Sequence, residues 1–354
     1  MRLRCTPVAV HLSILLAAGA WAQQSENSVL HAVPKPAAVV IDGALDDWDR
    51  SGQIEIFANY RTRNTYSAKV AAMHDAERFY LAVEWRDPTP LYNMVDANFE
   101  IGSGWKGDCL QLRLLTDLPM HLDCWYSTAA SKPVINIQYG SFDGKNPMPM
   151  SKLNPFPHAN AIGQGAEQAF ARGADGKSYT QEIALPWRLI TGGNVTVKET
   201  GARVSERSAY GVGERFHMGI ELLWGGADGR TFPSHRYADL LKEGTSSREF
   251  FWVGERVWGP VVLEEKGNLA LPVPDYESRM EAYRQKTEGP VKLAYTMPFD
   301  GYATLVIEDL QGRRVRNLIG MAARPKGNQV DFWDCSDENG ALVPPGEYRL
   351  RGLC

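Results

Sequence analysis

The chain has 354 residues, of which 44% are hydrophobic and 23% charged, so it is long enough for two domains with ordinary globular cores. Its formal net charge is −4 and no run of Lys and Arg stands out, which excludes the electrostatic footprint of a nucleic-acid-binding protein. The 33 glycines and 21 prolines indicate many turns between short elements.

The first 22 residues have the pattern of a signal peptide. Two arginines precede an apolar run from Pro7 to Trp21, and small residues on either side of Trp21 form an A-x-A cleavage pattern. The run is too short for a membrane anchor. We therefore expect cleavage after Ala22 and a mature protein without a membrane span that is secreted, periplasmic or at the cell surface. Removing residues 1–22 removes two Arg and no acid, which changes the net charge from −4 to −6.

Short alternating runs between turn residues predict a β-sandwich domain from 23 to 270. The clearest runs are 69–73, 79–85, 109–114 and 219–224. Apolar side chains at every second position are typical of strands with one buried face. The fold class is therefore all-β, a sandwich of the immunoglobulin-like or jelly-roll type. One short helix, capped by Ser234 and running through 239–242, is expected in this domain.

Two cysteines are expected on one hairpin. Strands 108–115 and 120–127 flank a turn, which places Cys109 and Cys124 on neighbouring strands. With a loop of two or four residues the two thiols share a face, and export would then allow a disulfide. Diagonal placement exceeds disulfide reach and favours free thiols. Cys335 and Cys354 form a second possible pair.

Residues 271–289 are expected to link two domains. The segment starts with proline-spaced residues and continues with a helical pattern from Asp275 to Lys286. Residues 290–354 then show about five short strands and predict a small Ig-like β-sandwich. Because such folds usually have about seven strands, we expect the module to be either truncated or completed by a partner, with a complete minimal sandwich as the alternative.

Three segments, in order, resemble family 9 carbohydrate-binding modules and their DOMON-like relatives. Val40–Trp48 resembles the opening I-D-G-x-x-D-x-x-W, Met73–Val83 with Asp87 resembles the next hairpin, and Glu182–Trp187 resembles the strand end E-I-x-I-P-W. The resemblance covers about Val33–Leu269 and implies a sandwich that binds carbohydrate without catalysis. Trp48 and Trp187 of these motifs are expected in the core.

The resemblance also permits calcium. Asp42, Asp46 and Asp87 are candidate ligands, because this hard cation binds carboxylate and carbonyl oxygens. The alternative is that these turn carboxylates cap local N–H groups.

A related branch of the superfamily, the haem subunit of ethylbenzene-dehydrogenase-like enzymes, binds b-type haem. The run Val83–Pro90 resembles that branch. Met94, His217 and Met218 are the candidate axial ligands, although none stands in a matching motif.

A sugar site needs an exposed aromatic ring beside polar side chains. Trp105 lies in a glycine-rich loop next to Asp108 and is the leading candidate for an aromatic platform. Trp125 or Tyr126, and Trp224, are weaker candidates. Because Trp125 and Tyr126 are adjacent on a strand, they point to opposite faces and at most one belongs to a given site.

The C-terminal module resembles the Ig-like domain of the flagellar hook-capping protein. The matching segments are 309–316, 333–340 and 345–348. That family usually has Gly where Cys335 stands, so Cys335 is expected either to change the turn or to hold it at a backbone cost of about 1 kcal/mol. A spacer or docking role is expected.

Metalloprotease, nucleophile-elbow, P-loop and C-x-x-C motifs are missing from the sequence, and we expect no enzymatic activity. Because acidic residues are scattered along the chain, a paired-carboxylate glycoside hydrolase site is the alternative. The leading hypothesis is an exported accessory protein that binds a polysaccharide or oligosaccharide, together with other secreted or cell-surface proteins. A haem-b electron-transfer subunit and a purely structural surface module are the alternatives.

Overall fold

The computed structural model describes residues 25–57, 60, 62–141, 148–155, 160–226, 235–242, 257–287, 289 and 291–354. The expected signal peptide, 1–22, lies outside these residues. The chain divides into two compact units between Val273 and Pro274, within the range expected for the linker. None of the helices that the structure describes is long and apolar enough to span a membrane.

The strands of the first unit are β1 Leu30–Pro34, β2 Ile54–Phe57, β3 Ser67–His74, β4 Arg78–Arg86, β5 Cys109–Leu115, β6 Pro119–Ser127, β7 Lys132–Tyr139, β8 Leu153–Asn154, β9 Glu167–Arg172, β10 Ser178–Pro186, β11 Thr196–Val197, β12 Arg215–Trp224, β13 His235–Asp239 and β14 Gly259–Leu263. Its 3₁₀ turns are η1 Ile101–Lys106, η2 Met150–Lys152, η3 Ala161–Gln164, η4 Trp187–Leu189 and η5 Gly192–Asn194.

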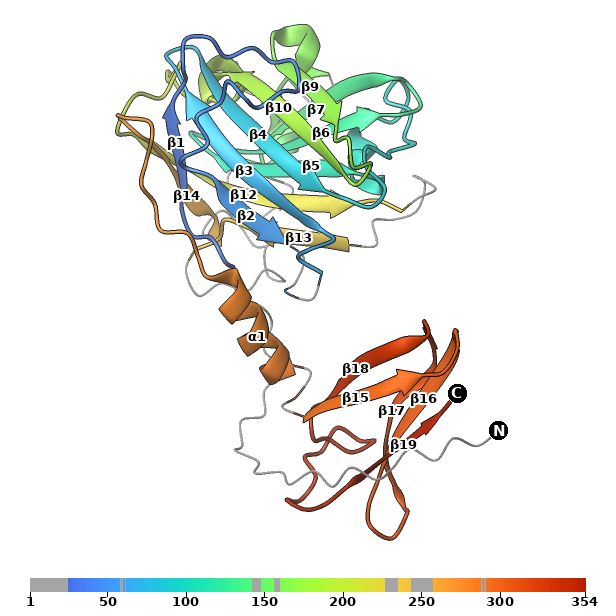
Figure 1. Cartoon of the computed structure of the whole chain (residues 1–354). Coiled ribbons are helices and arrows are strands. Elements are labelled where there is room, and N and C mark those ends of the chain that lie inside the picture. The colour runs from blue at the N-terminus through green and yellow to red at the C-terminus, as the bar shows by residue number, and fades with distance from the viewer. Residues whose placement is uncertain are drawn as a thin grey trace. The chain divides into compact units, whose positions relative to one another are not determined.

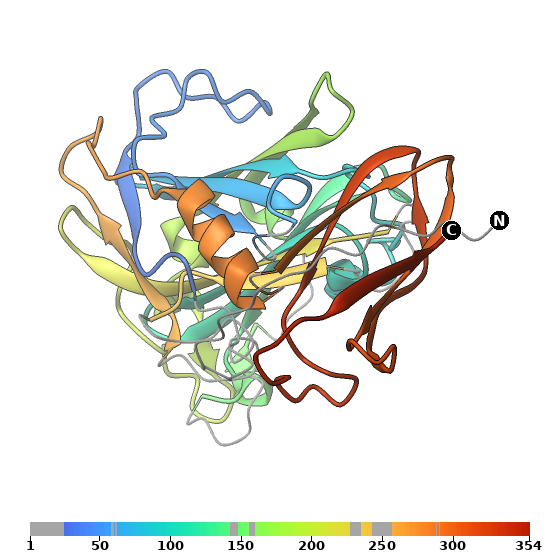
Figure 2. The same ribbon diagram turned by 60° about the horizontal axis from the view of Figure 1, so that its bottom comes forward.

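The first unit is a β-sandwich made from one continuous path of paired strands. The order is β7-β6-β5-β12-β14-β1-β3-β4-β10-β9, with β13 added to β12 and β2 added to β3, while β8 and β11 pair separately. β1 runs parallel to both β14 and β3, and the other pairs are antiparallel. Figures 1 and 2 show the two layers, with β3 and β4 (blue) in one and β12 (yellow) in the other.

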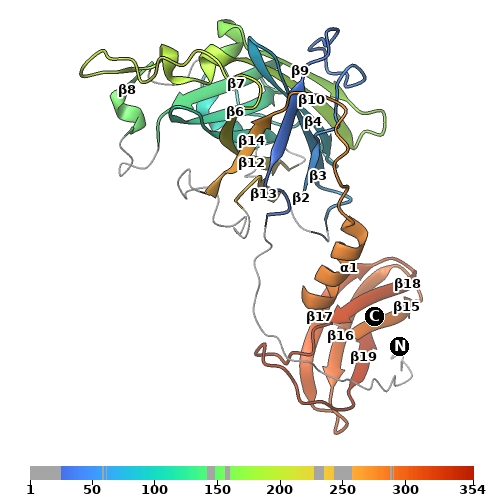
Figure 3. The same cartoon turned by 90° about the vertical axis from the view of Figure 1, so that its left-hand side faces the viewer.

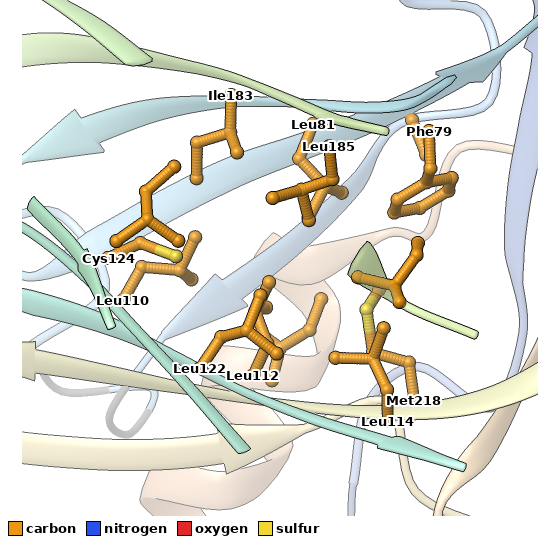
Figure 4. Packing of buried hydrophobic residues seen from close by; sticks show 14 of the residues in the cluster. Phe79, Leu81, Leu110, Leu112, Leu114, Leu122, Cys124, Ile183, Leu185 and Met218 are labelled. Carbon is orange, nitrogen blue, oxygen red and sulfur yellow. The ribbon is translucent and has the colours of Figure 1, made fainter. Parts of the chain in front are cut away.

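Strand alternation fills the space between the layers with apolar side chains. Figure 4 shows Phe79, Leu81 and Ile183 of β4 and β10 facing Leu112 and Met218 of β5 and β12. All five are fully buried. Because burying such a side chain stabilises the fold by about 1.5–3 kcal/mol, this core fixes which face of each strand points outward.

The four strand runs read from the sequence are confirmed as parts of β3, β4, β5 and β12. The predicted helix over 239–242 is wrong. His235–Asp239 forms β13, which pairs with β12 from Asp239 opposite Ile220 to His235 opposite Trp224. Pairing with β12 satisfies the backbone hydrogen bonds of this segment, and this long-range pairing outweighed the local signal for a helix cap.

Glu182 joins two of the segments that carried the sequence resemblance. Its carboxylate accepts hydrogen bonds from the backbone N–H groups of Asp42 and Gly43 and from the indole N–H of Trp48. Trp48 is buried, as expected, in a small cluster on the outer face of this layer. Gly43 has φ +98°, and a Cβ there would lie 2.9 Å from the backbone of Phe170. These motif residues therefore fasten the segment 39–48 to the sheet.

Two buried glutamines connect the layers near β7 and β9, the strands at the two ends of the paired path. Gln181 of β10 accepts the indole N–H of Trp85 at 3.0 Å and donates to the Cys124 carbonyl of β6 at 3.2 Å. It also donates to Gln168 Oε1 of β9 at 3.0 Å, and Gln168 in turn donates to the Trp125 and Val134 carbonyls. This buried amide chain ties β9 and β10 to β6 and β7.

Cys109 and Cys124 lie on one hairpin, as predicted, but on opposite faces. Leu115 pairs with Pro119, which leaves a three-residue loop, and Cys124 therefore lies opposite Leu110 rather than Cys109. Adjacent strand positions point to opposite faces, so the two thiols cannot form a disulfide. Both are free and buried, and Cys335 and Cys354 are also free.

Asp239 is a buried carboxyl at the end of β13 that holds the first described residues. It accepts the backbone N–H of Asn27 at 3.2 Å, the Asn27 side-chain amide at 2.7 Å, the Ser25 hydroxyl and the Leu240 N–H at 2.8 Å. Burial raises the pKa of Asp239 to about 6 despite these donors.

We expect this carboxyl to make stability depend on pH. The pKa of Asp239 in the folded state lies above the unfolded value of about 3.9, so the folded state favours the protonated carboxyl. The stabilisation that Asp239 contributes is therefore fully present below pH ~4 and is lost as the pH rises through ~6. Relative to Asp239→Asn, the free energy of unfolding of the wild type should fall by about 2–3 kcal/mol between pH 4 and 7. Urea titrations across this range measure the difference, and parallel pH profiles would contradict it.

The second unit contains the α-helix α1 Tyr276–Thr287 and five strands, β15 Val291–Met297, β16 Gly301–Glu308, β17 Arg314–Arg324, β18 Gly327–Trp333 and β19 Arg349–Leu353 (Figure 3). The helix follows the predicted pattern, and Asp275 caps it by accepting the Ser278 N–H at 3.1 Å.

The strands form two sheets, β15-β18 and β17-β16-β19, around a core that includes Val291, Ile307 and Trp333. Cys335 has φ +62°, so it holds the turn where the resemblance expected glycine. β17 was not expected as a strand.

Candidate functional site

The outer face of the layer β7-β6-β5-β12 carries buried polar side chains. Alternation sends the leucines of these strands into the core, so every second residue points outward. An outward position on a strand is normally solvated. Here Gln111, Asp123, Asn136 and Glu221 are at most 4% exposed. Polar groups this deeply buried need hydrogen-bond partners, which makes this face a candidate for ligand binding.

The pairing register aligns these four residues in one row across four strands. Asn136 of β7 lies opposite Asp123 of β6, Asp123 opposite Gln111 of β5, and Gln111 opposite Glu221 of β12. We call Asn136, Asp123, Gln111 and Glu221 the first polar row. Directly opposed residues on one face are close enough for side-chain contact.

A second polar row runs beside the first. Gln138 lies opposite His121, His121 opposite Arg113, and Arg113 opposite Gly219. Because glycine has no side chain, the second polar row has no side chain on β12. The two rows thus place amide, carboxylate, imidazole and guanidinium groups on one face.

Asp123 is the centre of the first row, and two oxygens beside it have no partner among the described residues. Gln111 Nε2 donates to Asp123 Oδ1 at 2.6 Å, and Asn136 Nδ2 lies 3.5 Å from Asp123 Oδ2. His121 Nε2 lies 3.0 Å from Asp123 Oδ1. Gln111 Oε1 and Asn136 Oδ1 accept no hydrogen bond from the part of the chain that the structure describes. Two buried acceptors aligned in one row are suited to receive hydroxyl groups from a ligand.

An apolar row borders the polar rows on one side. Val134, Trp125, Cys109 and Leu223 lie opposite one another and form one cluster. The turn η1 packs on this cluster, and a Cβ at Gly104 would lie 2.5 Å from the Trp125 ring. Trp105 of η1 is half-buried against the same cluster, so the turn brings it beside the polar rows.

The structure does not support Trp125 and Trp224 as platforms, which corrects the prediction from sequence. Trp125 is 1% exposed and Trp224 is fully buried in the core, where its indole N–H donates to the Arg86 carbonyl at 3.2 Å. Neither ring offers a face to a ligand in this structure. Tyr126 points to the opposite side from Trp125, as expected, and contacts Phe170 edge-on. Trp105 is the one predicted aromatic residue that stays partly exposed beside the polar rows.

Asp108 is structural rather than a contact for a ligand. It is 4% exposed, accepts the Tyr92 N–H at 2.8 Å and the Gly225 N–H at 2.7 Å, and so fixes two loops. Burial, together with the nearby Asp87 carboxyl, raises the pKa of Asp108 well above its usual value. Its hydrogen-bonding capacity is directed to the backbone.

The proposed calcium ligands are not brought together. Asp42 and Asp46 are exposed in the segment above Glu182, whereas Asp87 is fully buried and accepts the Thr89 N–H at 2.8 Å. Within the described ranges, three or more acidic, His or Cys side chains never gather as a metal site requires. Asp42 and Asp87 instead cap local N–H groups, those of Ala44 at 2.9 Å and of Thr89.

The haem candidates are also separated. Met218 is fully buried in the core, and the adjacent His217 is exposed on the other face of β12. Burial and the neighbouring Arg215 lower the pKa of His217. Met94 and His217 lie near different ends of the sheet. Met94 follows Asn93, whose backbone N–H donates to Thr128 just after β6. His217 pairs with Leu115 at the far end of β5. No two of these residues face a common site.

Sequence reasoning missed the polar rows, although their signal is present. The strands read Leu-Gln-Leu-Arg-Leu in β5 and Asn-Ile-Gln in β7, with a polar residue at every second position. That pattern is normally interpreted as a solvated face. The strand register and the burial of both rows, which the sequence does not reveal, distinguish the two cases.

Comparison with solved structures identifies carbohydrate-binding modules. A family 9 module from Caldicellulosiruptor kristjanssonii in complex with cellotriose aligns with 70% of this chain and 99% of its own, at 13% identity and a TM-score of 0.41. The same kind of module with glucose aligns with 68% of this chain and 100% of its own, at 12% identity and a TM-score of 0.40.

A putative carbohydrate-binding protein from Bacteroides uniformis aligns with 68% of this chain and 100% of its own, at 9% identity and a TM-score of 0.40. No protein-family model and no curated protein matches the sequence.

Proposed function

We propose that the protein is an exported, non-catalytic module that binds a saccharide on the outer face of β7-β6-β5-β12. The observation that carries this proposal is the first polar row, in which no described residue donates to Gln111 Oε1 or Asn136 Oδ1 beside Asp123. Leaving a buried acceptor unpaired costs about 1–3 kcal/mol. A ligand that donates hydroxyl groups to both oxygens would remove that cost.

A saccharide fits the chemistry of both rows. Its hydroxyl groups both donate and accept, and the rows offer carboxylate acceptors alongside amide and guanidinium donors. The ring's C–H face needs an apolar neighbour, and the half-buried Trp105 lies at the border of the rows.

Replacing Gln111 by Leu tests the proposal. The change keeps approximate size but removes the acceptor, so we expect at least about tenfold weaker binding, equivalent to about 1.4 kcal/mol or more. Isothermal titration with a panel that starts with glucose and cellotriose measures it. Gln53→Leu, an exposed amide outside the face, is the matched control and should bind like the wild type. Equal affinity of the wild type and Gln111→Leu would remove the first row from the site.

Replacing Trp105 by Ala tests the aromatic contact. One ring face against a sugar buries about 50–100 Å² of apolar surface, worth about 1–3 kcal/mol. We therefore expect roughly tenfold weaker binding with an unchanged melting temperature. A variant that melts early would instead show that Trp105 serves mainly to anchor η1 on the Trp125 cluster.

A further inference from the structure

A separate groove lies on the outer face of the other layer, over β4, β10 and β9. Its volume is about 400 Å³, within the range of about 300–1,000 Å³ typical of small-molecule sites. It lies between the sheet and the segment that contains Asp46 and Arg50, drawn in dark blue near β9 and β10 in Figure 1. Its polar lining includes Asp46, Arg50, Glu84, Ser178 and Thr180.

An ion pair on the groove wall presents a donor and an acceptor side by side. Arg50 Nη1 lies 3.0 Å from Glu84 Oε2, and the two side chains are 43% and 42% exposed. Each group therefore retains hydrogen-bonding capacity toward the groove. Two neighbouring hydroxyl groups, one accepting from Arg50 and one donating to Glu84, match this arrangement.

The segment that contains Asp46 and Arg50 forms one wall of the groove, and hydrogen bonds hold it in place without a ligand. Gly43 donates its N–H to the buried Glu182 and accepts the Thr180 hydroxyl through its carbonyl. Asp49 accepts the N–H groups of Ser51 at 2.9 Å and Asn268 at 2.7 Å. A wall held on both sides loses little freedom on binding, and such preorganisation increases affinity.

The charge of the groove selects among ligands. Arg172 contributes to the lining, but its guanidinium donates to the Pro90 and Leu91 carbonyls. Hydrogen bonds to neutral carbonyls leave the charge of Arg172 in place, so Arg50 and Arg172 balance Asp46 and Glu84. A lining without net charge favours a neutral ligand over an anionic or a cationic one.

We propose that this groove is a second saccharide site, independent of the polar rows, that takes a neutral sugar ring through adjacent hydroxyl groups on Arg50 and Glu84. It goes beyond the proposed function because it uses other residues on the opposite outer face. A protein with both sites would hold two sugar units at once.

Backbone-amide NMR titrations of the full mature chain test the groove. Methyl β-glucoside, glucosamine and glucuronate are the probes, and the reporters are the amides of Ala171, Gly173 and Thr180. We expect saturable shifts that are strongest for methyl β-glucoside and weaker for the charged probes, glucosamine and glucuronate. Arg50→Met and Glu84→Gln should each weaken binding at the groove at least threefold, while Arg78→Met, which breaks an ion pair outside the groove, should not.

The outcomes separate the two sites. Shifts at the groove that persist in Gln111→Leu would show that the sites are independent. Absence of saturable shifts at these amides with all three probes, or unchanged affinity in Arg50→Met, or preference for glucuronate would each overturn the proposal. Binding confined to the polar rows would overturn the groove and leave the proposed function intact, and binding confined to the groove would do the reverse.

Discussion

Replacing Gln181 by Leu is expected to lower the free energy of unfolding of the first unit by about 3–5 kcal/mol. The substitution leaves the Trp85 indole N–H, the Cys124 carbonyl and Gln168 Oε1 without their shared partner. Each buried polar group left unpaired costs about 1–3 kcal/mol. The melting temperature should therefore fall by about 10 °C for a domain of this size.

Urea denaturation followed by tryptophan fluorescence measures this effect. The control is again Gln53→Leu, which replaces an exposed amide and should change stability by less than about 0.5 kcal/mol. A loss below about 1 kcal/mol in Gln181→Leu would show that the layers are held at this edge by apolar packing alone.

Replacing Glu182 by Leu is expected to release the segment 39–48 from the sheet. The N–H groups of Asp42, Gly43 and Trp48 all lose the same acceptor. We expect about 3–5 kcal/mol of destabilisation and rapid proteolysis within this segment, where Val40 is already 58% exposed. Glu182→Gln, which keeps one acceptor oxygen, should lie between the wild type and Glu182→Leu.

Limited proteolysis with mass mapping, together with urea titration, checks the prediction. Glu167→Leu is the control, because this carboxylate is exposed on β9 and pairs with Arg78; exposed ion pairs contribute about 0–1 kcal/mol. Cleavage patterns that are the same in Glu182→Leu and the wild type would contradict the role assigned to Glu182. Because the segment also forms one wall of the groove, Glu182→Leu should abolish sugar binding there.

Much of the fold follows from strand periodicity and local chemistry. The leucines of β5 alternate with polar residues, and the register confirms that this alternation separates the core from the outer face. Trp48 and Trp187 were expected in the core because they stand at the ends of structural motifs, and both are buried. The positive φ of Cys335 follows from its position where the turn favours glycine.

Other features depend on information that no local pattern contains. One residue more or less in the loop after Leu115 decides whether Cys109 and Cys124 share a face, and the loop has three residues. The segment before Leu240 became β13 because β12 offered it a partner. Local propensity does not reveal such long-range pairing.

The site was predictable only in part. A Trp in a glycine-rich turn indicated Trp105, and the structure leaves that side chain partly exposed. Trp125 on β6 and Trp224 at the end of β12 are buried by residues distant in sequence, which no local pattern reveals. The first polar row brings together Asn136, Asp123, Gln111 and Glu221 from four strands, and a single sequence gives no means of aligning them.

The most direct test of the central claim is a crystal structure of the mature protein with the tightest-binding sugar from the titration panel. Our account predicts a sugar ring on the outer face of β7-β6-β5-β12, with hydroxyl groups within about 3 Å of Gln111 Oε1 and Asn136 Oδ1. It also predicts that Trp105 contacts the ring. A ligand at saturating concentration that lies only elsewhere on the molecule, with both oxygens still unpartnered, would contradict the account.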